Sequence, residues 1–121
     1  MNNTEKLAQR GAKVVMNTYS RFPIAFDHGQ GVYVWDMDGK KYLDFVAGIA
    51  VNSLGYSHPK LCAKIAEQCQ KLMHVSNLYY TEPQITLAEE LCEHSCFDKV
   101  FFCNSGAESI ESMLKLARKY A

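Results

Sequence analysis

The sequence predicts a mixed α/β fold, and three stretches of the chain carry that prediction. Residues 31–45 place aromatic and β-branched runs on either side of Asp38-Gly39, a dipeptide typical of hairpin turns. Apolar side chains recur at helical spacing between residues 59 and 73. Residues 100–109, VFFCNSGAES, join an apolar, strand-like run directly to a helix start. Such a strand–helix step is the unit from which parallel α/β sheets are assembled.

The bulk composition excludes several classes of protein. The chain has 121 residues, 48% of them hydrophobic, and its 13 basic and 13 acidic side chains cancel, which leaves no basic face for nucleic acid. No apolar run approaches the roughly 20 residues of a membrane span, and the N-terminal MNNTEKLAQRGAK lacks the apolar segment of a secretory signal. An odd count of five cysteines suits a reducing compartment. We therefore expect a cytoplasmic protein.

The elements before residue 60 follow from local signals. We expect a short helix over 4–16, an extended segment from Tyr19 to Phe26, strands over 31–36 and 40–45, and either a core strand or a ligand-approach loop over 47–55. The hairpin is interpreted as scaffold.

The second half is predicted to be helical, apart from one strand. We expect a helix capped by Ser57 and running to about Met73, a helix that begins at Pro83 and is capped by Thr81 or Glu82, a strand over 99–103, and a last helix from Gly106 to the end. Each helix has an apolar stripe that should face a core. The stripes comprise Leu61, Ile65, Cys69 and Leu72; Ile85, Ala88, Leu91 and Cys92; and Ile110, Met113, Leu114 and Ala117.

The Asn-Ser-Gly step before the last helix admits two interpretations. The first turn of a helix has amide groups without intrahelical partners and a partial positive charge, so it suits a phosphate. Gly106 would leave these amides open, Ala107 keeps the next position small, and Ser105 adds a hydroxyl. Ser105 and Glu108 also form a capping-box pattern, which serves stability alone. The local pattern by itself favours capping.

Other motifs for catalysis or metal binding are weak. The chain has no Gly-Lys-Ser/Thr phosphate loop and no Gly-x-Ser-x-Gly turn, and Gly29-x-Gly31 precedes a strand instead of following one. Cys92-Glu93-His94-Ser95-Cys96 invites a zinc interpretation, but no second ligand pair follows, so structural thiols are favoured.

Three stretches carry a resemblance to a known family. Residues 31–59, 76–84 and 101–121 resemble, in order, the N-terminal part of class III pyridoxal-phosphate-dependent aminotransferases. The resemblance implies the N-terminal segment of a fold-type-I transferase, incomplete as a domain. Residues 1–76 would belong to the small domain and 77–121 to the start of the large cofactor-binding domain. It also implies a homodimer with active sites at the subunit interface.

The resemblance also implies roles for individual residues. Ser105, Gly106 and Ala107 match the turn that holds the phosphate of pyridoxal 5'-phosphate, with Glu108 as a supporting cap. Tyr19 and Arg21 match a segment that reaches the substrate pocket, where a guanidinium would suit a carboxylate.

One position bears on the choice of substrate. Ile49 stands where ornithine-specific relatives carry a tyrosine, which argues against free ornithine.

The implied activity belongs to a longer parent protein. The resemblance is strongest to members that transfer an amino group from N-acetylornithine to 2-oxoglutarate, by a ping-pong mechanism in arginine biosynthesis. Ornithine, succinylornithine and 4-aminobutyrate are alternative donors. The family's Schiff-base lysine lies beyond position 121, so the chain alone is expected to be inactive. A non-catalytic oligomerisation fragment is the alternative from another class, since an unpaired Val-Phe-Phe strand would favour self-association.

Overall fold

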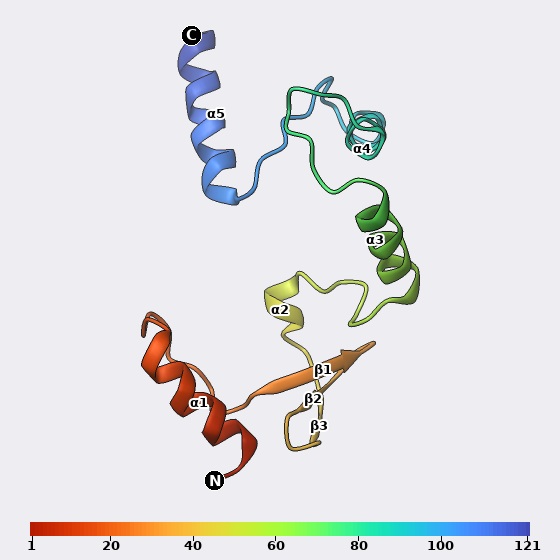
Figure 1. The fold of residues 1–121 in the computed structure, drawn as a ribbon. Coiled ribbons are helices and arrows are strands. Elements are labelled where there is room, and N and C mark those ends of the chain that lie inside the picture. Colours follow the sequence, from red (N-terminus) through yellow and green to blue (C-terminus); the bar gives the residue numbers. More distant parts are fainter. The chain divides into compact units, whose positions relative to one another are not determined.

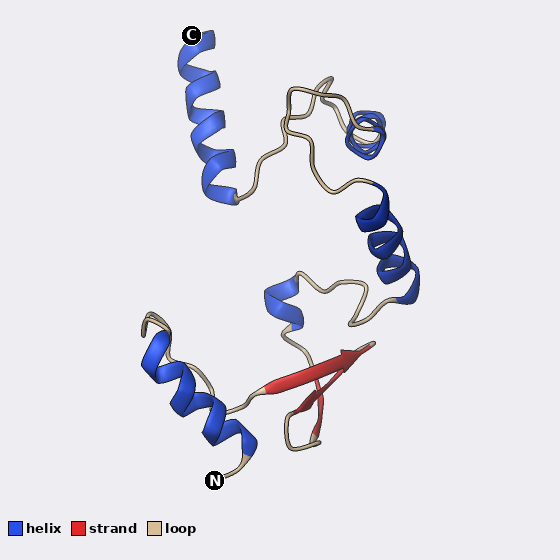
Figure 2. Cartoon of the chain, viewed as in Figure 1, coloured by secondary structure: helices blue, strands red, loops and turns tan.

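The computed structural model describes all residues from Met1 to Ala121, which divide into two units, Met1–Met73 and His74–Ala121. The first unit contains, in order, α1 (Asn3–Val14), β1 (Phe26–Gln30), β2 (Tyr33–Asp36), β3 (Lys41–Leu43), α2 (Ala47–Ala50) and α3 (Pro59–Lys71) (Figure 1). The second contains α4 (Glu82–Glu93) and α5 (Gly106–Tyr120), joined by a segment without regular secondary structure (Figure 2). The predicted mixed α/β segment is confirmed. The division between small-domain and large-domain parts after residue 76 stays a prediction.

A three-stranded antiparallel sheet in the order β1-β2-β3 is the centre of the first unit. Val34 in β2 is opposite Gly29 of β1 and Tyr42 of β3, and it is the one buried hydrophobic residue of the chain, at 6% exposure. The hairpin of β2 and β3 was predicted. β1 was not, because its sequence FDHGQ has little β-propensity and forms a strand only by pairing with β2.

The turn between β2 and β3 is organised by Asp36, whose side chain is 8% exposed. Its carboxylate accepts hydrogen bonds from the Tyr42 hydroxyl at 2.8 Å and from the amides of Lys40 at 2.8 Å and Asp38 at 3.0 Å. These bonds, the one from Tyr42 foremost, hold the pKa of Asp36 below its usual range. Gly39 completes the turn with a φ of 83°, a value that favours glycine.

The helix ends follow local capping rules, with one correction. In α1, Asn2 and Glu5 exchange side chain-to-backbone hydrogen bonds in a complete capping box. The predicted Ser57 cap of α3 is wrong: His58 is the cap, and its Nδ1 accepts from the Leu61 amide at 3.4 Å. Ser57 instead has a φ of 53°, and its hydroxyl donates to the Gly29 carbonyl at 2.8 Å. Thr81 occupies the cap position of α4 without a side-chain cap bond.

The strand predicted over 99–103 is absent. The sheet comprises β1, β2 and β3 only, and no segment of the chain pairs with residues 99–103. A strand requires a neighbour for its backbone donors and acceptors, so a strand-like sequence alone does not form one.

The apolar stripes of α3, α4 and α5 are largely solvent-exposed, so their predicted inward orientation is wrong within this chain; of their members, only Ala88 and Cys92 of α4 are half-buried. Ile65 of α3 is 54% exposed and Ile110 of α5 is 55% exposed. The strand pairs β1–β2 and β2–β3 are the only elements in extended mutual contact. The helices therefore have amphipathic faces but no layer to cover them, as befits a partial domain. No helix in the chain has the length and apolar character that crossing a membrane requires.

Two glycines allow a matched test of the hairpin turn. A methyl group added at Gly39 or at Gly11 of α1 would meet no atom within 4 Å, so the two sites differ in backbone conformation and not in space. Gly39→Ala should destabilise the hairpin by about 1 kcal/mol because it forces alanine to a φ of 83°. Gly11→Ala should instead stabilise α1 by about 0.5–1 kcal/mol. Amide hydrogen exchange in β2 and α1 measures both, and equal effects at the two sites would contradict the turn geometry.

Candidate functional site

The predicted phosphate turn lies at the N-terminus of α5, in the second unit. Ser105 is the cap residue with extended backbone angles, φ −153° and ψ 159°, and Gly106 is the first helical residue. The Ser105 hydroxyl oxygen accepts from the Glu108 amide at 3.3 Å, and its carbonyl accepts from Ser109 at 3.1 Å. Residues 105–107 therefore open the helix, which is the placement that anion binding requires.

The amides of Gly106 and Ala107 donate to no acceptor in the chain. The Glu108 carboxylate accepts from the Asn104 amide at 2.6 Å, one residue before the cap, and so leaves these two amides available. The serine half of the predicted capping box is thus formed, and the glutamate reaches back one residue farther than the standard motif. Capping and an open pair of amides coexist at this turn.

Space around the turn permits close approach to the backbone. A methyl group added at Gly106 would meet no atom within 4 Å. A depression of about 500 Å³ runs along α5 from Ala107 to Lys115, but its lining does not include Ser105 or Gly106. Lys115 is paired with Glu111 at 2.9 Å, which leaves the backbone as the main source of positive potential at the turn. The residues present therefore fit a phosphate group.

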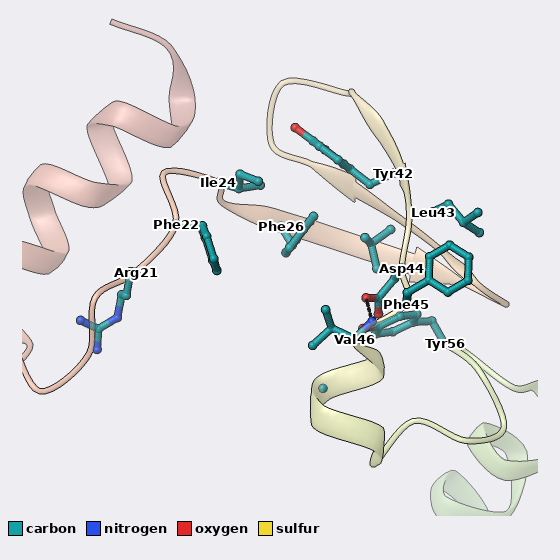
Figure 3. A pocket seen from close by; sticks show the side chains of 12 residues that line it. Arg21, Phe22, Ile24, Phe26, Tyr42, Leu43, Asp44, Phe45, Val46 and Tyr56 are labelled. Carbon is teal, nitrogen blue, oxygen red and sulfur yellow. Dashed lines mark hydrogen bonds between the residues drawn. The ribbon is translucent and has the colours of Figure 1, made fainter.

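The other predicted site residues belong to the first unit. Arg21 is at one side of a largely apolar groove of about 760 Å³, on the segment that precedes Phe22 (Figure 3). Gly48, next to Ile49, lines the same groove, and Ile49 itself is 86% exposed. Tyr19 is exposed and does not line the groove. Of the three predicted substrate residues, only Arg21 lines the groove; Ile49 adjoins it through Gly48, and Tyr19 does not reach it. The roles of these residues remain predictions.

Sequence reasoning missed a polar cluster around Asp44. Its carboxylate accepts from the Tyr56 hydroxyl at 2.7 Å and from the amides of Val46 at 2.8 Å and Ala47 at 3.0 Å (Figure 3). An aspartate two residues before a bend is a known turn signal and could have indicated the two amide bonds. Nothing local points to Tyr56, twelve residues away.

Hydrogen bonding shifts the pKa values of this pair in opposite directions. The bond from Tyr56, followed by those from Val46 and Ala47, holds the pKa of Asp44 below its usual range. The same bond to a carboxylate raises the pKa of Tyr56. At neutral pH the pair is therefore a neutral phenol donating to an ionised carboxylate. Elsewhere, the five cysteines are free thiols, and no group of three or more acidic, histidine or cysteine side chains could hold a metal ion.

Comparison with known proteins gives one consistent family. The model of the class-III aminotransferases matches residues 14–121. The acetylornithine aminotransferase of Synechocystis sp. is 62% identical over 107 residues, which cover 88% of this chain and 25% of that protein. The chain thus spans about a quarter of the length of this curated relative.

Solved structures of aminotransferases match nearly the whole chain. The structure of acetylornithine aminotransferase from Elizabethkingia anophelis matches with a TM-score of 0.92 and 37% identity, covering 99% of this chain and 31% of that one. An ornithine aminotransferase from Toxoplasma gondii matches with a TM-score of 0.93 and 31% identity, covering 98% and 28%.

The Asp44–Tyr56 bond can be tested by titration. Tyr56→Phe removes the largest cause of the low pKa, so the pKa of Asp44 should rise toward the ordinary value of about 3.9. Because the folded-state pKa is lowered, the contribution of Asp44 to stability is present above about pH 4 and is lost as the pH falls below it. Carbon NMR of the carboxyl group follows the titration. Tyr42→Phe is the control, since it should shift Asp36 and leave Asp44 unchanged. An unshifted Asp44 in Tyr56→Phe would show that the bond does not form in solution.

Proposed function

The chain belongs to the class-III aminotransferase family, and on this premise we propose that it carries the phosphate-binding turn of a pyridoxal-phosphate-dependent aminotransferase. The observation that carries the proposal is the start of α5, where the amides of Gly106 and Ala107 have no acceptor and a methyl group added at Gly106 would meet no atom within 4 Å. A doubly charged phosphate is the ligand that such a turn favours most.

Each residue of the turn has a distinct part in holding the cofactor. Gly106 and Ala107 would donate their backbone amides, and the Ser105 hydroxyl, which accepts from Glu108, retains its own hydrogen to donate. When bound, pyridoxal phosphate supplies the electron sink for amino-group transfer. The protein's contribution here is to fix one end of the cofactor, so that its reactive carbon is presented in one orientation.

The proposed reaction is the transfer of an amino group from N-acetylornithine to 2-oxoglutarate, carried out by a cytoplasmic homodimeric parent protein in arginine biosynthesis. The name of the Synechocystis relative, at 62% identity, supports N-acetylornithine as the donor. The chemistry of Ile49 supports it too, because an apolar, exposed side chain suits a neutral acetamide better than the ammonium of free ornithine. Arg21 would bind a substrate carboxylate, since it forms no ion pair in the chain.

Free ornithine is the second candidate donor. The likeness to the Toxoplasma gondii ornithine aminotransferase, with a TM-score of 0.93, favours it at the level of the fold. Assays of the whole protein with N-acetylornithine and with ornithine, each against 2-oxoglutarate, decide between the two. We expect the larger kcat/KM with N-acetylornithine.

Substitution at Gly106 tests the phosphate turn. In the whole protein, Gly106→Val should weaken pyridoxal phosphate binding by at least about tenfold, because the branched side chain keeps the phosphate from at least one charge-assisted amide bond. Absorbance titration with the cofactor measures the affinity. Ala117→Val, in the same helix three turns away, should leave the affinity unchanged. Equal affinities for the Gly106 variant and the unaltered protein would refute the phosphate turn.

A second experiment addresses the missing lysine. The 121-residue chain, mixed with pyridoxal phosphate and treated with borohydride, should form no specific reduced adduct at a single lysine, because we assign none of its lysines as the Schiff-base partner. Absorbance and peptide mass spectrometry detect such an adduct. A stoichiometric adduct at one lysine would overturn the assignment of the catalytic lysine to another part of the parent protein.

A further inference from the structure

The turn that precedes Asn52 has a backbone conformation that side chains rarely adopt. Four consecutive residues have positive φ: Ala47 at 48° and Gly48, Ile49 and Ala50 at 64° each. Three of the four carry a Cβ, which crowds the following carbonyl in this left-handed region. Such a run persists only where surrounding contacts over-determine it.

The entry to the turn is fixed by Asp44. Its carboxylate binds the amides of Val46 and Ala47 at 2.8 and 3.0 Å, so the first left-handed residue is tied to the end of β3. The Ala47 carbonyl then accepts from the amides of Val51 and Asn52 at 2.9 and 3.0 Å, which closes the turn on itself.

The exit is fixed by Tyr56, which returns to the same carboxylate at 2.7 Å. Its backbone exchanges hydrogen bonds with Gly31 at 2.8 and 2.9 Å, and so extends the sheet pairing to this loop. Its ring lies directly against β1, since a methyl group added at Gly29 would be 2.5 Å from the Tyr56 Cγ. Both ends of the loop are thus anchored to the hairpin through one carboxylate and one tyrosine.

The strain does not serve to bury the side chain at the apex. Ile49 is 86% exposed, although its backbone is held in an unfavourable conformation. Gly48 is the one residue of the run suited to both the conformation and the space, because a methyl group there would be 2.9 Å from Val51 Cγ2. Strained backbone of this kind clusters at ligand sites, and Gly48 of this turn lines the same groove as Arg21.

From this arrangement we propose that Asp44 and Tyr56 are positioning residues, which hold the left-handed turn Ala47–Ala50 so that Ile49 faces the apolar part of the amino donor. The inference rests on the proposed function for the identity of that donor. Neither Asp44 nor Tyr56 needs to touch substrate, because each acts through the backbone of the turn.

The test compares two matched tyrosine variants in the whole protein. Tyr56→Phe removes the hydroxyl bound to Asp44, and Tyr42→Phe removes the equivalent hydroxyl bound to Asp36 in the hairpin turn. We expect Tyr56→Phe to raise KM for N-acetylornithine by about tenfold, the effect of one charge-assisted hydrogen bond, with kcat and the affinity for pyridoxal phosphate nearly unchanged. Tyr42→Phe should leave all three values close to those of the unaltered protein.

A rescue variant separates positioning from general loss of structure. Glycine adopts positive φ at no steric cost. Adding Ala50→Gly to Tyr56→Phe should therefore lower KM most of the way back to the value of the unaltered protein. Backbone chemical shifts of Ile49 and hydrogen exchange of the Val51 and Asn52 amides report the turn directly. In Tyr56→Phe these amides should exchange about tenfold faster.

The outcomes distinguish this inference from the proposed function. Equal KM values for the two tyrosine variants, or an Ile49 backbone unaltered by Tyr56→Phe, would overturn the positioning role. A parallel loss of kcat, KM and cofactor affinity without rescue would assign the pair a purely structural role and would also overturn it. Absence of transamination by the unaltered protein would refute the proposed function instead, and the backbone measurements would still decide whether Tyr56 holds the turn.

Discussion

Backbone pairing of β2 with β1 and β3 is the constraint on which the rest of the first unit depends. Val34 at its centre is the chain's one buried hydrophobic residue, so side-chain burial contributes little and the hydrogen-bonded ladder contributes most of the order. Each end of the β2–β3 hairpin is closed by the same device, an aspartate that accepts two backbone amides and one tyrosine hydroxyl. Asp36 with Tyr42 closes the turn, and Asp44 with Tyr56 ties the following loop to the sheet.

The stability of the helices depends on burial of an apolar face more than on hydrogen bonds within the helix. Helices of 12 to 15 residues, such as α3, α4 and α5, are marginal in water unless an apolar face is buried. Local side-chain caps are present at α3 and α5, whereas the apolar faces of all three helices are largely uncovered in the chain. Because the chain spans about a quarter of its Synechocystis relative, we expect the remainder of a parent protein to supply the covering layers. The same reasoning accounts for residues 99–103, a strand sequence that lacks the neighbours needed to pair.

Features that depend on nearby residues could be predicted from the sequence, whereas features that depend on distant contacts could not. The start of α5 at Gly106 and the hairpin around Asp38-Gly39 depend on neighbours within four residues, and both were predictable. β1 depends on pairing with β2, which has no local signal, and the loop at Ile49 is tied to Tyr56 by a bond that spans twelve residues. The Ser105 cap at the start of α5 was predictable because it depends on residues within one turn of the helix. The full Asp44 cluster had no local signal because Tyr56, one of its three donors, lies twelve residues away.

The two proposed contacts with small molecules use the backbone in opposite ways. At α5, Gly106 has no positive φ to accommodate, so what glycine contributes there is space around two amides. At α2, the conformation is one that glycine would favour, yet Ile49 and Ala50 occupy it. A glycine at position 49 would relieve the strain and remove the side chain together. In the proposed role, isoleucine places an apolar side chain toward the amino donor, and the amide bonds to Asp44 help to offset the conformational cost.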